Sequence, residues 1–249
     1  VFKKDNTEKK PEAYQISVNE DGLTIISSDA VGMFRGVVTA LQILPGKLRH
    51  DFKLPYCTIK DEPVFAWRGL MLDVSRHFFT VDEVKRFIDR MALYKFNVFH
   101  WHLTDDEAWR IQIKAYPQLT AKGSWRVART GKFGTRPAPK SDEPTPYGGF
   151  YTQDEIKEVV NYAKSRHITV VPEIDVPGHS MALLTAFPEL CTKKETKMVS
   201  CGFKFADWYG NGTFKMLVEN MLNPSDKRVY EVLDTIFGEV ANLFPGEYI

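Results

Sequence analysis

The spacing of apolar residues along the chain separates two kinds of pattern. In the first, apolar-rich runs at Ala13–Val18 and Leu23–Ser27 flank a polar turn that ends in glycine, which predicts a β-hairpin. A helix is predicted from Asp29 onwards. The apolar positions on one face of this helix are Phe34, Val37, Leu41 and Leu44. Because one hairpin and one helix cannot cover both faces of a sheet, this region is expected to pack on the later part of the chain or to continue before Val1.

From about Pro63 the pattern changes to strands that alternate with helices. Short, almost wholly apolar runs predict strands that are buried on both faces. These strands are Gly69–Val74, Asn97–Leu103 and Ile168–Asp175, with a fourth beginning at Tyr248-Ile249. Two Thr-x-x-Glu capping boxes and one further amphipathic run predict three helices. They begin after Thr80, after Thr152 and near Val229.

This alternation predicts parallel strands with right-handed crossovers, in a doubly wound sheet or in a (β/α)₈ TIM barrel. No Gly-x-Gly-x-x-Gly follows the first strand, which disfavours a dinucleotide-binding sheet. The long inserts all follow strands, as in barrels whose βα loops build the active site. A whole barrel needs about 250 residues. We therefore expect a small α+β domain over residues 1–62, and over residues 63–249 the N-terminal part of a barrel, with three strands and the start of a fourth.

Composition and charge narrow the classes of function. The 249 residues carry 33 Lys plus Arg and 32 Asp plus Glu, a net charge of +1, which gives no reason to expect a nucleic acid or an anionic membrane as partner. No stretch approaches 18 consecutive apolar residues, so none is predicted to span a membrane. Three cysteines are too few for a disulfide scaffold. Cys191 and Cys201 either form a bridge, in an exported protein, or remain buried thiols.

Polar residues at the predicted strand ends are the candidates for chemistry. Arg76 follows the first strand and offers a rigid fork of donors to a hydroxylated or anionic ligand, or else pairs with Asp73. His100 and His102 share a face of the second strand, which suits a divalent metal if His179 completes the set. Such histidines equally well form hydrogen bonds to neighbouring carboxylates without a metal.

The third strand adds two carboxylates and a histidine. Glu173 and Asp175 share a face, and a Pro-Gly turn is expected to bring His179 back over the barrel mouth. A histidine held by an aspartate suits a supporting role in acid–base catalysis, and the alternative is that His179 only fixes its loop. Aromatic residues in the strand ends and long loops, Trp109 among them, suit the C–H face of a sugar or simply form a loop core.

Two segments make this pattern specific to one family. They read WRGLMLDVSRHFFTVDEVKRFIDRMALYKFNVFHWHLTDDEAWRIQI and GGFYTQDEIKEVVNYAKSRHITVVPEIDVPGH. Both closely resemble the β-N-acetylhexosaminidases of glycoside hydrolase family 20, and the resemblance runs from about Ala13 to Ile249. It implies a small α/β domain before a (β/α)₈ barrel, and a retaining, substrate-assisted exo-glycosidase. In that reaction the 2-acetamido oxygen of the substrate attacks the anomeric carbon, a glutamate protonates the leaving oxygen, and the preceding aspartate orients the acetamide.

The resemblance also implies roles for individual residues. Arg76 resembles the arginine that binds the 3- and 4-hydroxyls of the terminal sugar, and Asp105 and His179 resemble the pair that supports the catalytic glutamate. The residues expected to line the pocket are Glu173, Asp175 and Trp109. The family's histidine pair is structural, so no metal and no cofactor are expected. Export to a periplasmic, extracellular or lysosome-like compartment follows from the family alone.

The catalytic Asp-Glu pair of the family would come just after a segment like residues 244–249, and it is not in the chain. Asp61-Glu62 lies in the interdomain connection and Asp82-Glu83 in a helix cap, so neither is that pair. We therefore expect the chain alone to be inactive, and its partners to be an oligosaccharide or glycoconjugate and the rest of the enzyme, as a second polypeptide or a continuation. Two other hypotheses stay open: a metal-dependent hydrolase using His100, His102 and His179, and a non-catalytic sugar-binding fragment.

Overall fold

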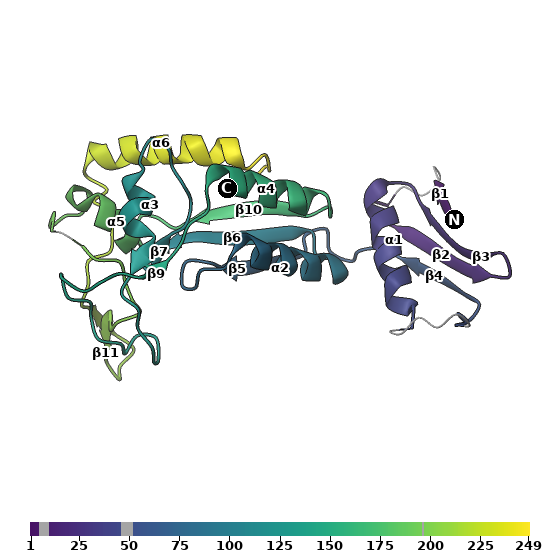
Figure 1. Cartoon of the computed structure of the whole chain (residues 1–249), viewed down its shortest axis with the longest axis horizontal. Helices are drawn as coiled ribbons and strands as arrows, with labels where there is room; N and C mark the ends of the chain where they lie inside the picture. The colour runs from purple at the N-terminus through teal and green to yellow at the C-terminus, as the bar shows by residue number, and fades with distance from the viewer. Residues whose placement is uncertain (5–9, 46–51, 196) are drawn as a thin grey trace.

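A computed structural model describes residues 1–4, 10–45, 52–195 and 197–249, and Figure 1 shows a small sheet with one helix beside a larger α/β unit. The small sheet has the order β1-β3-β2-β4. Its strands are β1 (Phe2–Lys4), β2 (Tyr14–Asn19), β3 (Gly22–Ser27) and β4 (Cys57–Asp61). β2 and β3 form the predicted hairpin, whereas β1 and β4 were not predicted. The two added strands widen the sheet, so the hairpin does not stand alone.

Helix α1 (Ala30–Ile43) covers one face of the small sheet, on the side toward the rest of the molecule (Figure 1). Asp29 caps it as expected, because its side chain accepts a hydrogen bond from the backbone N–H of Gly32. The predicted apolar face is partly wrong, since Leu41 is 60% exposed. Glycines face the sheet instead. A Cβ atom on Gly36 would lie 2.5 Å from Cγ2 of Ile25, so the helix and the sheet are too close for a larger residue.

The larger unit contains three parallel strands in the order β5-β6-β10, as the alternating pattern predicted. They are β5 (Gly69–Asp73), β6 (Val98–Asp105) and β10 (Thr169–Ile174). The helices α2 (Val81–Leu93), α4 (Gln153–Lys164) and α6 (Lys227–Leu243) accompany them. Both predicted capping boxes are formed, at Thr80 and at Thr152. The predicted fourth strand is absent from the described residues: Tyr248-Ile249 has no strand partner, and the Tyr248 ring packs edge-on against Trp67.

Long segments after β6 and β10 gather at the carboxyl ends of the strands (Figure 1). The first contains β7 (Ala108–Trp109), α3 (Gln118–Gly123), β8 (Trp125–Arg126) and β9 (Tyr147–Gly148). The second contains α5 (Met181–Ala186), a 3₁₀ turn (Pro188–Leu190), β11 (Ala206–Trp208) and β12 (Phe214–Met216). Cys191 and Cys201 lie buried in this second segment as free thiols. No helix in the described ranges is both long enough and apolar enough to cross a membrane.

Candidate active site

The ends of the three parallel strands meet at one level because of their register. Asp73 of β5 pairs with His102 of β6, and His102 pairs with Glu173 of β10. Partner residues of neighbouring strands project to the same face of a sheet. The predicted strand-end residues therefore form one continuous row across the sheet, and the loops after the strands close over it.

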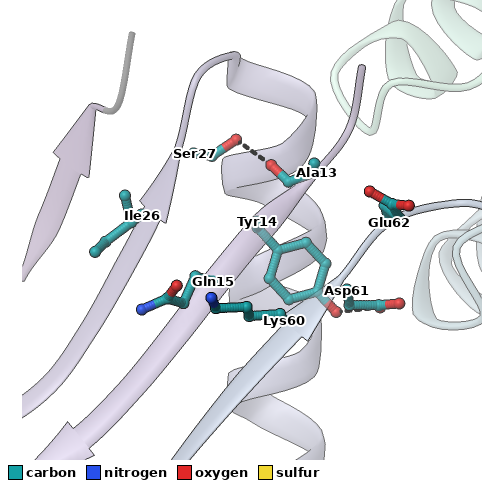
Figure 2. A pocket seen from close by; sticks show the side chains of 8 residues that line it. All are labelled: Ala13, Tyr14, Gln15, Ile26, Ser27, Lys60, Asp61 and Glu62. Carbon is teal, nitrogen blue, oxygen red and sulfur yellow. Dashed lines mark hydrogen bonds between the residues drawn. The ribbon is translucent and has the colours of Figure 1, made fainter. Parts of the chain in front are cut away.

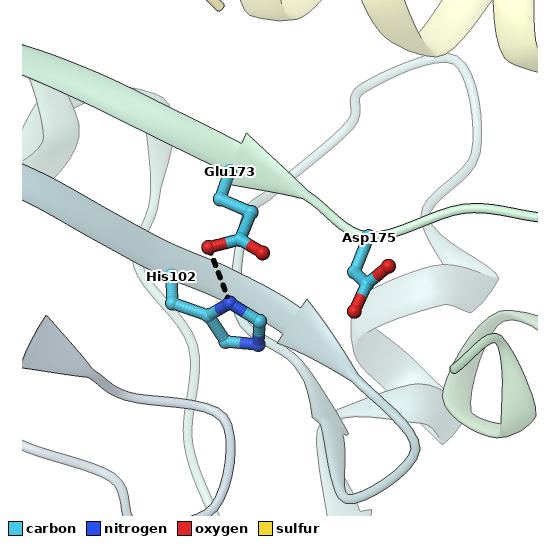
Figure 3. Close-up of side chains that lie close together, drawn as sticks. All are labelled: His102, Glu173 and Asp175. Carbon is cyan, nitrogen blue, oxygen red and sulfur yellow. Dashed lines mark ion pairs between the residues drawn. The ribbon is translucent and has the colours of Figure 1, made fainter. Parts of the chain in front are cut away.

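His102 is held between two carboxylates. Its Nε2 lies 2.9 Å from Asp105 Oδ2. Its Nδ1 lies 2.6 Å from Glu173 Oε2, a contact that Figure 3 shows. Burial alone would lower the pKa of His102, but the hydrogen bonds to Asp105 and Glu173 outweigh it and raise the pKa to about 9. The imidazole is therefore protonated at neutral pH, and both ring nitrogens act as donors.

Arg76 is the most heavily paired cation of the site. Its guanidinium forms ion pairs with Asp73 (2.9 Å), Asp105 (2.7 Å) and Glu107 (2.9 Å). Its side chain remains 37% exposed. A guanidinium has five N–H donors, so after three ion pairs part of the fork remains available to a ligand. The carboxylates fix its plane, and the sequence prediction of a rigid donor fork at this position is consistent with the geometry.

Asp105 is the carboxylate that contacts Arg76 and two histidines of the site. It is 1% exposed and accepts contacts from Arg76, His102 and His179, the last at 3.0 Å from Nδ1 to Oδ1. Burial alone would raise its pKa, but the His102 hydrogen bond and the Arg76 charge hold the pKa below its usual range. Asp105 is therefore ionised at neutral pH, and it orients three cationic or titratable groups at once.

His179 is the exposed member of this cluster. Its side chain is 53% exposed, and its backbone has φ of 49°, in the left-handed region that residues other than glycine rarely adopt. Burial alone would lower its pKa, but the charges of Asp105, Asp106 and Asp175 outweigh burial and raise it. His179 thus presents to solvent a ring whose Nδ1 is already held by Asp105.

The three remaining residues predicted to line the pocket lie in different surroundings. Glu173 lies in the row and also contacts Nε2 of His100, at 2.5 Å. Asp175 follows a register shift after Glu173, and burial raises the pKa of its half-buried carboxyl group (Figure 3). Trp109 is 1% exposed, and its Nε1 donates to the carbonyl of Ile111, so the structure places this ring in the core and not against a ligand.

Sequence reasoning missed two acidic residues that directly follow Asp105. Glu107 accepts from Arg76 through Oε2 and from the hydroxyl of Ser200 through Oε1, and Asp106 accepts from the amide of Asn220. Burial is the main cause that raises the pKa of both carboxyl groups. They tie the second long segment to the strand ends. The signal was available as a run of three acidic residues at the end of a predicted buried strand.

Two groups of side chains have ligand atoms close enough to hold a metal ion. They are His102 with Glu173 and Asp175, and Asp105 with Asp106 and His179. The predicted set of His100, His102 and His179 is not among the groups found in the described part of the chain. In the first group both ring nitrogens of His102 already contact carboxylates, so a metal ion would have to displace one of these contacts and the ring proton. In the second, the Arg76 cation already pairs with Asp105.

A separate hollow of about 570 Å³ lies on the small sheet, over β2, β3 and β4 (Figure 2). Two of its polar groups are paired with each other: the Tyr14 hydroxyl donates to Asp61, and Lys95 of the larger unit lies 2.7 Å from the same carboxylate. This cluster joins the two units, as does Glu12, which pairs with Arg68 at 2.6 Å. The hollow contains none of the strand-end residues, so the candidate site is the row around Asp105.

Comparisons with known proteins point to one family over both units. The models of "Glycosyl hydrolase family 20, catalytic domain" and "Glycosyl hydrolase family 20, domain 2" match residues 65–249 and 1–62. A β-hexosaminidase from Porphyromonas gingivalis is 41% identical over 246 residues, which cover 96% of this chain and 28% of that protein. One from Vibrio furnissii is 41% identical over 237 residues, which cover 95% of this chain and 36% of that protein.

Solved structures agree with these sequence matches. An exo-β-N-acetylglucosaminidase from Vibrio harveyi, in complex with N-acetylglucosamine, gives a TM-score of 0.78 at 38% identity, over 98% of this chain and 36% of that one. A β-N-acetylhexosaminidase from Streptomyces coelicolor A3(2) gives 0.80 at 36% identity, over 99% of this chain and 46% of that one. The chain therefore spans less than half the length of each of these relatives.

Proposed function

The chain belongs to glycosyl hydrolase family 20, and from that premise we propose that it supplies part of a retaining exo-glycosidase that removes terminal β-linked N-acetylhexosamine. The observation that carries the proposal is the cluster around buried Asp105, which holds Arg76, His102 and His179 at the carboxyl ends of parallel strands. In α/β barrels the active site lies at these ends. We propose that β5, β6 and β10 are the first three strands of such a barrel.

Arg76 is proposed to bind the hydroxyls of the terminal sugar. Its plane is fixed by Asp73, Asp105 and Glu107, so the free part of its fork is oriented before a ligand arrives. Charge-assisted hydrogen bonds from a fixed guanidinium are stronger than neutral ones and lose less entropy on binding. Arg76 is therefore expected to contribute to transition-state binding as well as to ground-state affinity.

The proposed reaction is substrate-assisted. The acetamide oxygen forms a bond to the anomeric carbon as the glycosidic C–O bond breaks, and a carboxylic acid gives its proton to the leaving oxygen. Water then adds to the anomeric carbon, its proton returns to the carboxylate, and the acetamide is restored. Two inversions retain the configuration.

The proton donor of this reaction must be neutral and open to the substrate. Asp105 and Glu173 are ion-paired with cations, and Glu107 is buried. We therefore propose that the donor is a residue outside these 249 positions, and that Asp105 and His179 support it. Asp175 is the alternative donor within the chain, since its pKa is raised and its carboxyl group is half-buried.

The structure suggests where the rest of the fold would pack. Within the described residues β5 and β10 each pair only with β6, which leaves one edge of each strand open. Met71 of β5 is 50% exposed. Open edges with exposed apolar residues favour association with further strands. We propose that these edges receive the remaining strands of the barrel, and that the 249 residues alone do not turn over substrate.

The test uses the whole protein that carries this chain and the nitrophenyl β-glycoside of N-acetylglucosamine. Arg76→Ala should lower kcat/KM by about 30-fold or more, which corresponds to roughly 2 kcal/mol or more of lost charge-assisted bonding. Arg86→Ala removes an exposed arginine of α2 and serves as the matched control. A loss below threefold for Arg76→Ala would remove Arg76 from the site, and an inverted product anomer in the NMR spectrum would refute the substrate-assisted route.

Two further measurements separate the alternatives. Asp175→Asn should retain a measurable rate; loss of the alkaline limb of the pH profile in this variant would make Asp175 the proton donor, because that limb records ionisation of the acid. Turnover that stops with a chelator and returns with zinc would favour the metal-dependent hydrolase. Sugar affinity without turnover in the whole protein would favour a non-catalytic sugar-binding role.

A further inference from the structure

A second hollow adjoins the candidate site and is rich in arginine. It has a volume of about 770 Å³ and opens beside Arg76, which forms part of its wall. The other guanidinium groups in the wall belong to Arg126, Arg129 and Arg136, all from the long segment after β6. One carboxylate, Glu143, lies among them.

The positive charges among the residues that line this hollow outnumber the negative ones. Nη2 of Arg129 donates to both carboxylate oxygens of Glu143, at 2.8 and 2.7 Å, so these two charges neutralise each other. Arg76 is paired with carboxylates of the strand-end row. In the ranges that the structure describes, neither Arg126 nor Arg136 has a carboxylate oxygen within the 4.0 Å of an ion pair. Among the described residues, these two guanidinium groups thus have no direct ion pair, although the more distant Glu107 carboxylate acts on Arg126.

Arg136 is held in place by backbone. Its Nε donates to the carbonyl of Gly131 and its Nη1 to that of Cys201, both at 3.0 Å. Gly202 makes this position possible, because a Cβ atom there would lie 2.9 Å from Nη1 of Arg136. Carbonyls fix the orientation of the guanidinium without neutralising it, so Arg136 keeps a full charge and an unused Nη2 group.

Arg126 supplies the second positive charge in the wall of the hollow. It is buried, it donates to the carbonyls of Ser75, Arg76 and Glu107, and its guanidinium lies 4.6 Å from the centre of the Tyr147 ring. Burial is the main cause that lowers its pKa, and the nearby Arg136 charge lowers it further. An anion in the hollow would relieve both effects.

We propose that this hollow binds an oxyanion, a sulfate ester or a carboxylate, carried by the glycan whose terminal N-acetylhexosamine is bound at Arg76. This inference rests on the proposed function for the sugar and on the arginine wall for the anion. Arg136 is the direct ligand, through the N–H donors of its Nη2 group, which are free to form charge-assisted bonds to such an oxyanion. Because Arg76 belongs to both the site and the hollow, the anion and the terminal sugar fit one substrate molecule.

Calorimetric titration of the whole protein tests this proposal with six probes at low salt. They are N-acetylglucosamine, its 3-, 4- and 6-sulfates, an N-acetylhexosamine disaccharide with a uronic acid, and inorganic sulfate. At least one sulfated or carboxylated sugar should bind about tenfold or more tightly than the neutral sugar, as expected for one charge-assisted pair. Tighter binding of the sulfated sugars alone would identify a sulfate ester as the oxyanion. Tighter binding of the uronic acid disaccharide alone would identify a carboxylate.

Variants test whether the preference for an anionic sugar depends on the residues that line the hollow. Arg136→Gln should abolish the preference for the anionic sugar and leave the affinity for the neutral sugar unchanged, whereas Arg136→Lys should retain part of it. Glu143→Gln frees Arg129 and should strengthen anion binding. Lys132→Gln removes an exposed cation of the same loop that does not line the hollow, and it is the matched control.

Failure of this proposal is distinguishable from failure of the proposed function. Inorganic sulfate needs no sugar site, so weak sulfate binding that Arg136→Gln removes would support the hollow even if no sugar binds. Equal affinity for neutral and anionic sugars, or a preference that Arg136→Gln leaves intact in a protein with an unchanged Tm, would overturn it.

Discussion

The charge on His102 is the feature of the site whose consequence for stability can be worked out most directly. The protonated ring lies between Asp105 and Glu173, and its pKa is about 9 compared with the ordinary 6.5. The folded state therefore binds one proton more than the unfolded state between these two values. Since stability falls with pH wherever the folded state holds the extra proton, the contribution is complete below pH 6.5 and is lost as pH rises through about 9.

The size of the effect follows from the shift. One pKa unit corresponds to about 1.4 kcal/mol, so the free energy of unfolding should fall by that amount per pH unit across this window, and by roughly 3 kcal/mol in total. Urea titrations of the whole protein at pH 6, 7, 8 and 9 measure the slope. His102→Gln should flatten it, whereas His77→Gln, which alters a histidine bound to the Tyr147 hydroxyl, should leave it in place.

The imidazole can also be observed without any substitution, which keeps the test valid if His102→Gln does not fold. An NMR titration of the histidine ring protons should show one ring with a midpoint well above 6.5. If His102 titrates at 6.5 or below, or if the slope persists unchanged in a folded His102→Gln variant, the two carboxylates do not hold the charge as argued.

Three other predictions concern packing and positioning. Thr152→Ala removes the capping box of α4 and should lower the free energy of unfolding by about 1 kcal/mol in urea titration. Gly123→Ala would place a Cβ atom 2.7 Å from the carbonyl of Ala182, so it should destabilise by about 1–3 kcal/mol, seen as a lower Tm. Glu107→Gln keeps an acceptor for Arg76 but removes the charge, and steady-state kinetics should show KM raised about threefold to tenfold with a smaller change in kcat.

Local sequence patterns predicted those elements of the fold that depend on residues close to one another in the sequence. The hairpin, the capping boxes at Thr80 and Thr152 and the three parallel strands depend on neighbours within a few residues. The prediction that these strands are buried on both faces is wrong for β5, where Leu70 is 40% and Met71 50% exposed because no strand covers its outer edge in the described residues. The buried face of α1 does not, because it is set by how closely the sheet approaches Gly36. Strand β4 was missed since it pairs with β2 across a wide gap in sequence, which no local pattern records.

The sequence predicted several residues of the site, but it did not predict the contacts between them. Arg76 and His179 were singled out from strand ends and Asp105 from the family resemblance, and the first two both contact Asp105. Trp109 was expected at the pocket from its position in an aromatic-rich loop, but residue type alone cannot distinguish a ring that faces a ligand from one that fills the core. Glu107 was missed because its role depends on Ser200, which lies 93 residues away in sequence.

Strand register connects the electrostatics of the site to its folding. Asp73, His102 and Glu173 face one another only because the three strands pair at one level. A slip of one residue in β6 would turn His102 away from Glu173 of β10, and it would move buried Asp105, which is also in β6, out of register with Arg76. An unpaired buried carboxylate is costly, so the charges that orient Arg76 also oppose the wrong register. The same ion pairs that prepare a donor fork for the sugar therefore help to specify the sheet that carries it.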